Sequence, residues 1–383
     1  MDGVAQSNPL RHERRGSVLL LIMAAKPVNA LAADLRRALS AGFDAAEADA
    51  TVRAVVICSD LGSFSAGADL AELSRKDTTP PSIRLDDLCL RIESFSKPVV
   101  AALNGQTLGA GLSLALSAKG RIAAPQAALG FPDVGLGAVP EAGGIQRLTA
   151  RVGVPVALRM LLEPGAISAA QALTVGLVDA VAETDLRRSA VALAERLVDA
   201  PQQAGPRRDG KAAFAAIAAA RLKVAHSHLP APLRAIECVE AAQLLPLEQA
   251  LAFDAAAHDD LIRSPQAQGL RHAFLAERRA SAAPAALAAH PADCPTEVAI
   301  WGAGAGAADL AAQALAAGLR VSVIDANRET LASCLSIIAT RQEQAVTEGR
   351  QSAEARDADW ARLSSSVGPE RLATAEIIFA GPD

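Results

Sequence analysis

Two segments of small residues in the first third of the chain could present backbone amides to a ligand. Ser63–Leu70 reads Ser-Phe-Ser-Ala-Gly-Ala-Asp-Leu, and Asn104–Leu112 reads Asn-Gly-Gln-Thr-Leu-Gly-Ala-Gly-Leu. Small residues let the main chain approach a bound molecule closely, and helix N-termini carry N–H groups without partners. Two such donors aimed at one carbonyl oxygen form an oxyanion hole, which stabilises an enolate. Either segment alone is also typical of an ordinary strand–helix turn.

A third glycine-rich segment has the spacing of a dinucleotide-binding turn. Gly302, Gly304 and Ala307 give the pattern G-x-G-x-x-A directly after the apolar run Glu297–Trp301. The glycines allow a tight turn and close approach of a pyrophosphate, and Ala307 takes the position that packs helix against strand. Asp325, at the end of the next predicted strand, can accept hydrogen bonds from a ribose, which favours NAD over NADP. The alternative is a turn of this shape that binds nothing.

Short apolar runs and amphipathic stretches alternate around the first two segments. The predicted buried strands are Ser17–Ala24, Arg53–Ser59 and Pro98–Leu103. Between them, apolar residues four apart over Leu31–Ala48 predict a helix. From about 201 to 279 the pattern is helical throughout. Alternating strands and helices imply an α/β layer structure.

Composition divides the chain into four predicted parts. They are a first domain over 1–200, a helical connector over 201–278, an Ala- and Pro-rich linker over 279–295, and a second α/β domain over 296–383. In the last part we expect a helix at Ala307–Leu319 and a strand at Arg320–Ile324. The chain stops just after another strand-like run, Ala375–Phe379, so the second domain is expected to be truncated.

Composition also excludes several classes of protein. The 383 residues carry a formal net charge of −5, which argues against a nucleic-acid partner. Hydrophobic residues make up 51% of the chain, too many for a disordered protein. The five cysteines are widely spaced without a C-x-x-C pair, as expected for reduced thiols of a cytoplasmic protein that has no metal site. No apolar run approaches the ~20 residues that span a membrane.

Four motifs in order strengthen the first prediction. They are Asn29–Leu31, Ser65–Asp69, Asn104–Gly111 and Phe131–Leu148. Together they resemble the crotonase (enoyl-CoA hydratase/isomerase) family over roughly residues 15–200. The resemblance implies a spiral of ββα turns, a coenzyme A thioester as substrate and an enolate intermediate. It places the oxyanion donors on the backbone N–H groups of Ala68 and Ala110.

Departures from the family pattern bear on the reaction. Hydratases of this family carry two glutamates at positions that here hold Ser113 and Asp133. Hydration requires an acid and a base beside the added water, and a serine hydroxyl serves as neither at ordinary pH. Glu141 stands where hydratases usually have glycine, and it resembles the acid that shuttles the proton in several crotonase-family isomerases. The alternative role for Glu141 is to stabilise a helix N-terminus.

The order of the parts resembles the multifunctional enzymes of fatty-acid β-oxidation, in which an L-3-hydroxyacyl-CoA dehydrogenase follows the hydratase/isomerase. Connector residues Ser264–Arg278 add to this resemblance. The predicted fold is therefore α/β: a crotonase-type ββα spiral, a helical connector and a partial Rossmann-type parallel sheet. The dehydrogenase's catalytic His–Glu pair would lie beyond Asp383, so we expect no dehydrogenase activity from this chain.

The preferred function is enoyl-CoA isomerisation, with Ala68 and Ala110 as oxyanion donors, Glu141 as proton shuttle and Asp133 as auxiliary acid or base. One alternative is a 2-enoyl-CoA hydratase that uses Asp133 and Glu141 together. Others are hydrolase or decarboxylase chemistry on the same scaffold, and a non-catalytic acyl-CoA- or NAD-binding protein. The expected partners are an acyl-CoA substrate, NAD in the second domain and further copies of the chain, with no membrane.

Overall fold

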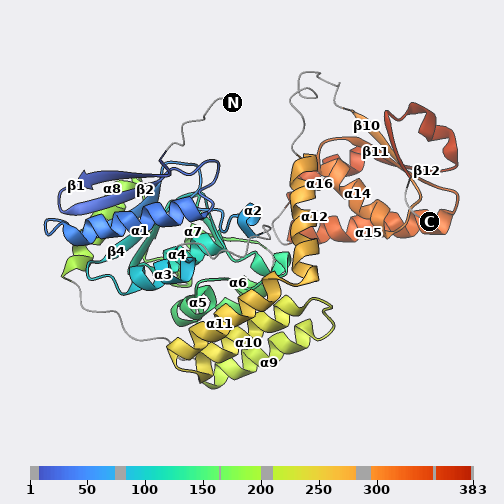
Figure 1. Ribbon diagram of the computed structural model, residues 1–383. Helices are drawn as coiled ribbons and strands as arrows, with labels where there is room; N and C mark the ends of the chain where they lie inside the picture. Colours follow the sequence, from blue (N-terminus) through green and yellow to red (C-terminus); the bar gives the residue numbers. More distant parts are fainter. Residues whose placement is uncertain are drawn as a thin grey trace, which may run out of the picture. The chain divides into compact units, whose positions relative to one another are not determined.

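A computed structural model describes residues 8–73, 83–163, 165–199, 210–281, 295–347 and 351–380. The chain divides into two units, Met1–Ser281 and Ala282–Asp383, and each is described on its own (Figure 1). The predicted boundaries at 200, 278 and 295 stay predictions, and residues 282–294 of the predicted linker lie outside the described residues. Within the described ranges, no helix has the length and hydropathy needed to cross a bilayer.

The first unit is built on a six-stranded sheet with strand order β1-β2-β3-β4-β6-β9. Its strands are β1 (Leu10–Arg15), β2 (Val18–Met23), β3 (Ala54–Ser59), β4 (Val99–Leu103), β6 (Gly120–Ala123) and β9 (Ala180–Val181). Every pair is parallel except β1–β2. β3 and β4 are buried along their whole length, which explains why they are apolar at every position except Ser59, the last residue of β3.

The order of the first strands differs from the prediction. The strand predicted at Ser17–Ala24 is present as β2, but its expected place as the first strand is wrong, because β1 precedes it and pairs antiparallel with it. β1 consists mostly of charged residues, and four of its six side chains are exposed or half-exposed cations and anions. It forms the edge of the sheet, where charged side chains discourage pairing with other molecules. An edge strand of this kind carries no apolar run.

A small sheet and a set of helices complete the first 200 residues. The small sheet has the order β5-β7-β8 and is formed by β5 (Gln106–Leu108), β7 (Ala128–Gly130) and β8 (Ile167–Ser168). The helices are α1 (Ala33–Ala48), α2 (Leu70–Leu73), α3 (Leu85–Glu93), the 3₁₀ helix η1 (Asp133–Leu136), α4 (Ala110–Ser117), α5 (Gly144–Val152), α6 (Val154–Leu162), α7 (Ala169–Thr174) and α8 (Leu186–Val198). α8 packs on β3, β4 and β6, while the main core is formed by residues of the same sheet together with the other helices.

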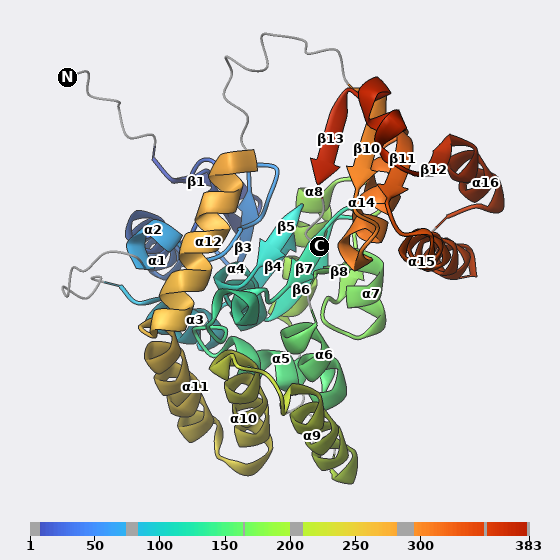
Figure 2. The ribbon, with the colours of Figure 1, turned by 90° about the vertical axis from the view of Figure 1, so that its right-hand side faces the viewer.

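Residues 210–281 are helical, as predicted, whereas residues 201–209 lie outside the described residues. The helices are α9 (Lys211–Val224), α10 (Pro230–Leu244), α11 (Leu247–Ile262) and α12 (Pro265–Ser281). α10 lies between α9 and α11, and the three helices run side by side against α5 and α6 (Figures 1 and 2). The connector therefore packs directly on the segment that leads into α5.

The second unit is a parallel sheet with the order β12-β11-β10-β13, flanked by helices. Its elements are β10 (Glu297–Trp301), α14 (Ala305–Ala316), β11 (Arg320–Asp325), α15 (Arg328–Thr347), α16 (Ala353–Arg362), β12 (Leu363–Val367), the 3₁₀ helix η2 (Pro369–Thr374) and β13 (Ile377–Ala380). The first helix begins at Ala305, two residues before the predicted start. Parallel strands joined by helices confirm the predicted Rossmann-type sheet.

Candidate active site

The two small-residue segments of the first unit come together beside the central sheet. Ser65 and Thr107 form a parallel bridge. The Ser65 N–H donates to the carbonyl of Gln106 (3.2 Å), and the Leu108 N–H donates to the carbonyl of Ser65 (3.0 Å). α4 begins two residues later, at Ala110. Segments that are far apart in the sequence are thus joined by main-chain hydrogen bonds.

Glycines allow the two segments to approach this closely. A Cβ on Gly67 would lie 3.0 Å from Leu108 O and 3.6 Å from Ala110 N, and one on Gly111 would lie 2.7 Å from Ser65 Cβ. Gly67 also has a φ of 106°, a conformation that a side chain disfavours. The sequence predicts that these glycines let the main chain approach a ligand. In the structure they are needed for the two segments to contact each other.

The structure leaves the N–H groups of Ala68 and Ala110 unpaired. Neither has a hydrogen-bond partner among the described residues, although the Gly67 N–H donates to Ser65 Oγ (3.2 Å) and the Gly109 N–H to Gly130 O (3.0 Å). The Ala110 N–H lies in the first turn of α4, where the helix dipole favours negative charge. The two predicted donors therefore lie in one region with no competing acceptor.

Asn29 ties the first segment to the sheet. Its Nδ2 donates to Ser59 Oγ (2.7 Å) and to Phe64 O (3.1 Å), and its Oδ1 accepts from the Ala25 N–H (2.8 Å). Ser65 Oγ in turn donates to Asn29 O (2.7 Å). Asn29 is fully buried with a φ of 50°, which asparagine adopts more readily than most residues. Sequence analysis uses Asn29 only as part of a motif and misses this structural role.

The Asp133 carboxylate lies directly against the second segment. A Cβ on Gly109 would be 3.2 Å from Asp133 Oδ1 and 3.3 Å from Oδ2. The Asp133 residue is half-buried, but its Oδ2 is enclosed and has no hydrogen-bond partner among the described residues. Burial raises the pKa of Asp133 to about 6, while attraction to His258 acts in the opposite direction. A carboxyl of this kind exchanges its proton near neutral pH.

Glu141 stands at the start of the tight turn that leads into α5. Its carbonyl oxygen accepts from Ser113 Oγ (2.9 Å) and from the Gly144 N–H (3.1 Å). The next residue, Ala142, has a φ of 54°. No described residue donates a hydrogen bond to the Glu141 carboxylate. Burial raises the pKa of Glu141, and His258 opposes this effect. The backbone is therefore fixed while the carboxylate is left available.

His258 of α11 is a site residue that sequence reasoning misses. Its Nδ1 lies 2.7 Å from the carbonyl oxygen of Val139, between Asp133 and Glu141 in the sequence. It is also the basic group with the largest electrostatic effect on both carboxylates. The residues around His258 do not indicate this contact, because only the packing of the connector helices brings His258 next to Val139.

An apolar groove of about 430 Å³ runs between α3 and α11, close to the Glu141 turn. Leu90, Leu247 and Leu251 are among its lining residues. Leu251 packs against Gly143, where a Cβ would overlap its Cδ2. Asp86, at the groove's polar side, further raises the pKa of Glu141. Apolar surface thus borders the turn that carries Glu141.

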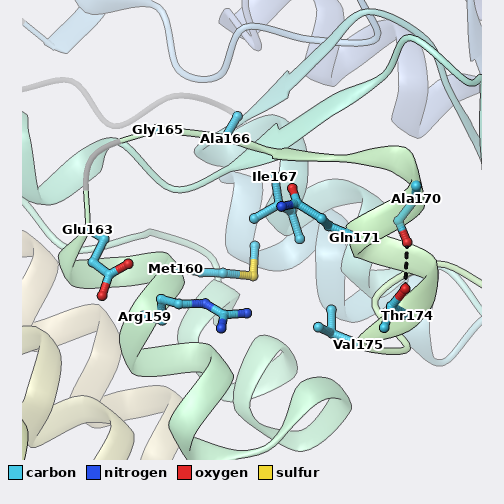
Figure 3. A pocket seen from close by; sticks show the side chains of 10 residues that line it. All are labelled: Arg159, Met160, Glu163, Gly165, Ala166, Ile167, Ala170, Gln171, Thr174 and Val175. Carbon is cyan, nitrogen blue, oxygen red and sulfur yellow. Dashed lines mark hydrogen bonds between the residues drawn. The ribbon is translucent and has the colours of Figure 1, made fainter. Parts of the chain in front are cut away.

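A larger cavity, of about 730 Å³, lies elsewhere on the first unit. It is lined by side chains of α6, β8 and α7, among them Arg159, Glu163 and Gln171 (Figure 3). The one hydrogen bond drawn there joins Thr174 Oγ1 to Ala170 O (2.9 Å). None of the four predicted catalytic residues lines this cavity. The candidate active site is therefore distinct from it.

The glycine turn of the second unit has the predicted geometry. Gly302 has a φ of 95°, and Ala307 is buried in the core between α14 and the sheet. Asp325 lies beside the turn, where its Oδ2 accepts from the Ala303 N–H (2.7 Å) and its Oδ1 from the Asn327 N–H (2.7 Å). These two donors lower the pKa of Asp325. The predicted ribose acceptor is thus in place but already bonded to backbone.

Within the part of the chain that the structure describes, no cluster of three or more His, Cys, Asp or Glu side chains could hold a metal ion. Cys58, Cys89, Cys238 and Cys334 are free and buried, and Cys294 lies outside the described residues. Burial raises the pKa of Cys58 to about 11, so this thiol is unreactive near neutral pH.

Comparison with known families divides the chain in the same way. A profile described as enoyl-CoA hydratase/isomerase matches residues 13–225. A profile described as 3-hydroxyacyl-CoA dehydrogenase, NAD binding domain, matches residues 297–380. Among solved structures, an enoyl-CoA hydratase/isomerase from Mycobacterium paratuberculosis is 25% identical, with a TM-score of 0.52 over 70% of this chain and 99% of that chain.

Similar curated proteins include larger enzymes. The peroxisomal bifunctional enzyme of Homo sapiens is 32% identical over 353 residues, which are 89% of this chain and 48% of that protein. That of Danio rerio is 36% identical over 69% of this chain and 37% of its own length. A probable enoyl-CoA hydratase of Bacillus subtilis is 38% identical over 49% of this chain and 74% of its own length. The chain thus spans about half the length, or less, of the bifunctional relatives.

Proposed function

The chain belongs to the enoyl-CoA hydratase/isomerase family, and on this premise we propose that it shifts the double bond of an enoyl-CoA thioester. Glu141 removes a proton from the carbon next to the thioester and returns it two carbons away. The electrons of the broken C–H bond move onto the thioester oxygen and back, so the reaction consumes neither water nor an oxidant. The N–H groups of Ala68 and Ala110 hold the charged oxygen, and Asp133 is an auxiliary acid or base.

The state of the Glu141 carboxylate carries the proposal. It lacks a hydrogen-bond donor among the described residues, burial raises its pKa, and the backbone carbonyl of Glu141 is held by two hydrogen bonds. A base that must take and return a proton works best when its pKa lies near the working pH and no fixed donor competes for it. At position 113, where a hydratase would have its first glutamate, Ser113 is bonded to the Glu141 carbonyl. The apolar groove beside the turn is a suitable place for part of the acyl chain.

Asp133 supports a second candidate, the hydration of a 2-enoyl-CoA. With a pKa near 6, Asp133 is present in both protonation states at neutral pH. Together with Glu141 it would supply the acid and the base that flank an added water. Asp133 has a shorter side chain than the glutamate of the hydratases that the sequence resembles, which is why isomerisation is preferred.

Activity on two substrates separates these candidates. We expect the enzyme to isomerise a 3-enoyl-CoA faster than it hydrates crotonyl-CoA. Glu141→Gln should lower kcat for isomerisation by about 10³-fold, because it removes the group proposed to carry the proton. Asp133→Asn should lower it by about threefold at most, since the auxiliary group does not carry the proton. Glu163→Gln, in the separate cavity, is the control and should be unchanged.

Each other outcome has a defined meaning. Isomerisation within threefold of wild type in Glu141→Gln would contradict the proposal. Hydration that exceeds isomerisation and is lost in both Glu141→Gln and Asp133→Asn would favour the hydratase. Binding of acyl-CoA in a thermal-shift titration without turnover of either substrate would favour a non-catalytic role.

For the second unit we propose that NAD binds at the glycine turn. Among the described residues, no atom lies within 4 Å of the place where a Cβ would stand on Gly304 or Gly306, so the turn offers room at the start of α14. Asp325 would exchange its bond to the Ala303 N–H for a ribose hydroxyl. When bound, NAD supplies a hydride acceptor. Calorimetric titration tests this: NAD should bind more tightly than NADP, and equal affinity or no binding would contradict it.

A further inference from the structure

We propose that Ser113 is a positioning residue that holds Glu141 at a fixed place relative to the Ala110 N–H. This inference rests on the proposed function, because it concerns how the base and the charge-stabilising donor are kept together. In the family pattern, Ser113 stands at the position of a glutamate. In the structure the hydroxyl makes a contact of its own.

The contact joins residues far apart in the sequence and is partly buried. Ser113 is fully buried in α4, and its Oγ donates to Glu141 O at 2.9 Å. A serine within a helix usually bonds a carbonyl of its own helix. Ser117, one turn later and equally buried, does so: its Oγ donates to Leu114 O at 2.7 Å. Ser113 instead donates its hydroxyl proton to the carbonyl of a different segment, which is unusual for a serine within a helix.

The space around Ser113 admits only a small side chain. A Cβ on Gly144 would overlap Ser113 Oγ and would lie 3.2 Å from a ring carbon of Phe131. The first turn of α5 is therefore pressed against α4 at this point. A glutamate at position 113 would have to displace that turn, so the structure replaces a long acidic side chain here by a short anchor.

The anchored turn is strained and needs support. Ala142 has a φ of 54°, a conformation that costs free energy in a residue with a side chain and persists only when surrounding contacts impose it. Three side chains from three helices supply such contacts. Ser113 bonds Glu141 O, Arg147 Nη1 bonds Ala142 O (2.5 Å), and His258 Nδ1 bonds Val139 O (2.7 Å).

Ser113 differs from the other two anchors in its place on α4. This helix begins at Ala110, so one rigid helical turn separates the predicted oxyanion donor from the residue that holds Glu141. The Ser113 N–H is itself bonded to Gly109 O (3.0 Å). The helix thus sets the distance between the Ala110 N–H and Glu141. A fixed distance is needed because both groups must act on the same substrate.

Ser113→Ala tests the proposal, with Ser117→Ala as the matched control. Both variants remove one buried hydroxyl from the same helix, so their effects on thermal unfolding should be similar. Only Ser113→Ala should lower kcat for isomerisation, by about 10-fold or more, with KM within about threefold of wild type. Equal kcat in the two variants would overturn the proposal. A fall of kcat in both would also overturn it, because loss of any buried hydroxyl would then suffice.

A second measurement does not depend on turnover. The carboxyl carbon of Glu141, labelled with ¹³C, can be followed by NMR while the pH is varied. The charged groups that act on this carboxyl include His258, Asp86, Arg36 and Glu72, and Asp133 also interacts with it; both variants leave all of them in place. Ser113→Ala should shift the titration curve, whereas Ser117→Ala should reproduce the wild type. An unshifted curve in Ser113→Ala would overturn the positioning role, whether or not the wild-type chain isomerises its substrate. Absence of isomerisation in the wild type would contradict only the proposed function.

Discussion

The glycine-rich turns of the two units use the same residue types for opposite reasons. In the first unit Gly111 is pressed against Ser65, with no space for a side chain. In the second unit Gly304 and Gly306 face open space. The first turn needs small residues because two segments of the protein must touch. The second has no such need within the described residues, so a ligand outside the chain is the better explanation for its glycines.

The aspartate beside each turn shows the same contrast. Asp133 has an enclosed oxygen without a donor, and burial raises its pKa to about 6. Asp325 accepts two backbone N–H groups, and these lower its pKa. One carboxylate is thus suited to exchange a proton and the other to remain an acceptor. The residue type beside a glycine turn therefore says little about its role until its donors are known.

The largest expected effect comes from filling the space in the first turn. Gly111→Ala places a methyl group 2.7 Å from Ser65 Cβ and 2.8 Å from Ser65 O, so the first segment must move. We expect the free energy of unfolding of the first unit to fall by about 3 kcal/mol. kcat/KM should fall by about 100-fold, because the Ala68 N–H moves with the segment.

Gly62→Ala is the control for this change, since no atom lies within 4 Å of a Cβ at Gly62. Gly62→Ala should leave the free energy of unfolding and kcat/KM nearly unchanged. Circular dichroism follows the helices of both units during denaturation, whereas Trp301 and Trp360, the two tryptophans of the chain, both belong to the second unit. A circular-dichroism transition that occurs without a change in tryptophan fluorescence therefore belongs to the first unit. Normal stability and activity in Gly111→Ala would show that the contact between the two segments is dispensable.

Opposite pH dependences should follow from the two aspartates. The pKa of Asp133 rises on folding from 3.8 to about 6, so its contribution to stability is complete below about pH 4 and is lost as the pH rises through 6. Asp133→Asn should therefore stabilise the first unit at pH 8 by about 1–2 kcal/mol and change little at pH 4. Denaturation at the two pH values measures the difference.

For Asp325 the sign is reversed. Its pKa is lowered on folding, so its contribution is present above the unfolded value and is lost as the pH falls through the folded value. Asp325→Asn should destabilise the second unit slightly at pH 8, with the effect disappearing in acid. If both variants shift stability in the same direction between the two pH values, the contrast between the aspartates is wrong.

The smallest effect is expected from Gly306→Ala. Gly306 lies in the first turn of α14 and faces open space, so alanine should stabilise the second unit by about 0.5 kcal/mol through its higher helix propensity. Tryptophan fluorescence during denaturation measures this gain. The added methyl group should at the same time weaken NAD binding, because it occupies the room left for the ligand. A loss of stability greater than about 1 kcal/mol would contradict the idea that this turn is open.

Local patterns predicted much of this molecule. The buried strands, the helical connector, the α/β class and the glycine turn of the second unit follow from apolar runs and turn residues that act over short distances. β1 was not predicted, because an edge strand can form without a run of apolar residues. α14 starts two residues and ends three residues before the prediction, and β13 starts two residues and ends one residue after it. The end of a helix or strand depends on its neighbours as well as on its own residues.

By itself the sequence determined which residues could do chemistry: the small residues around Ala68 and Ala110, and the acids Asp133 and Glu141. Only the tertiary structure decided how they are supported. Ser113 forms a hydrogen bond with a carbonyl 28 residues away in the sequence, and His258 forms one with a carbonyl 119 residues away. Such contacts are set by the packing of whole helices, whose interface is the sum of many weak interactions spread along the chain. A short window of sequence contains none of that information, so the anchors of the site become visible only in the folded chain.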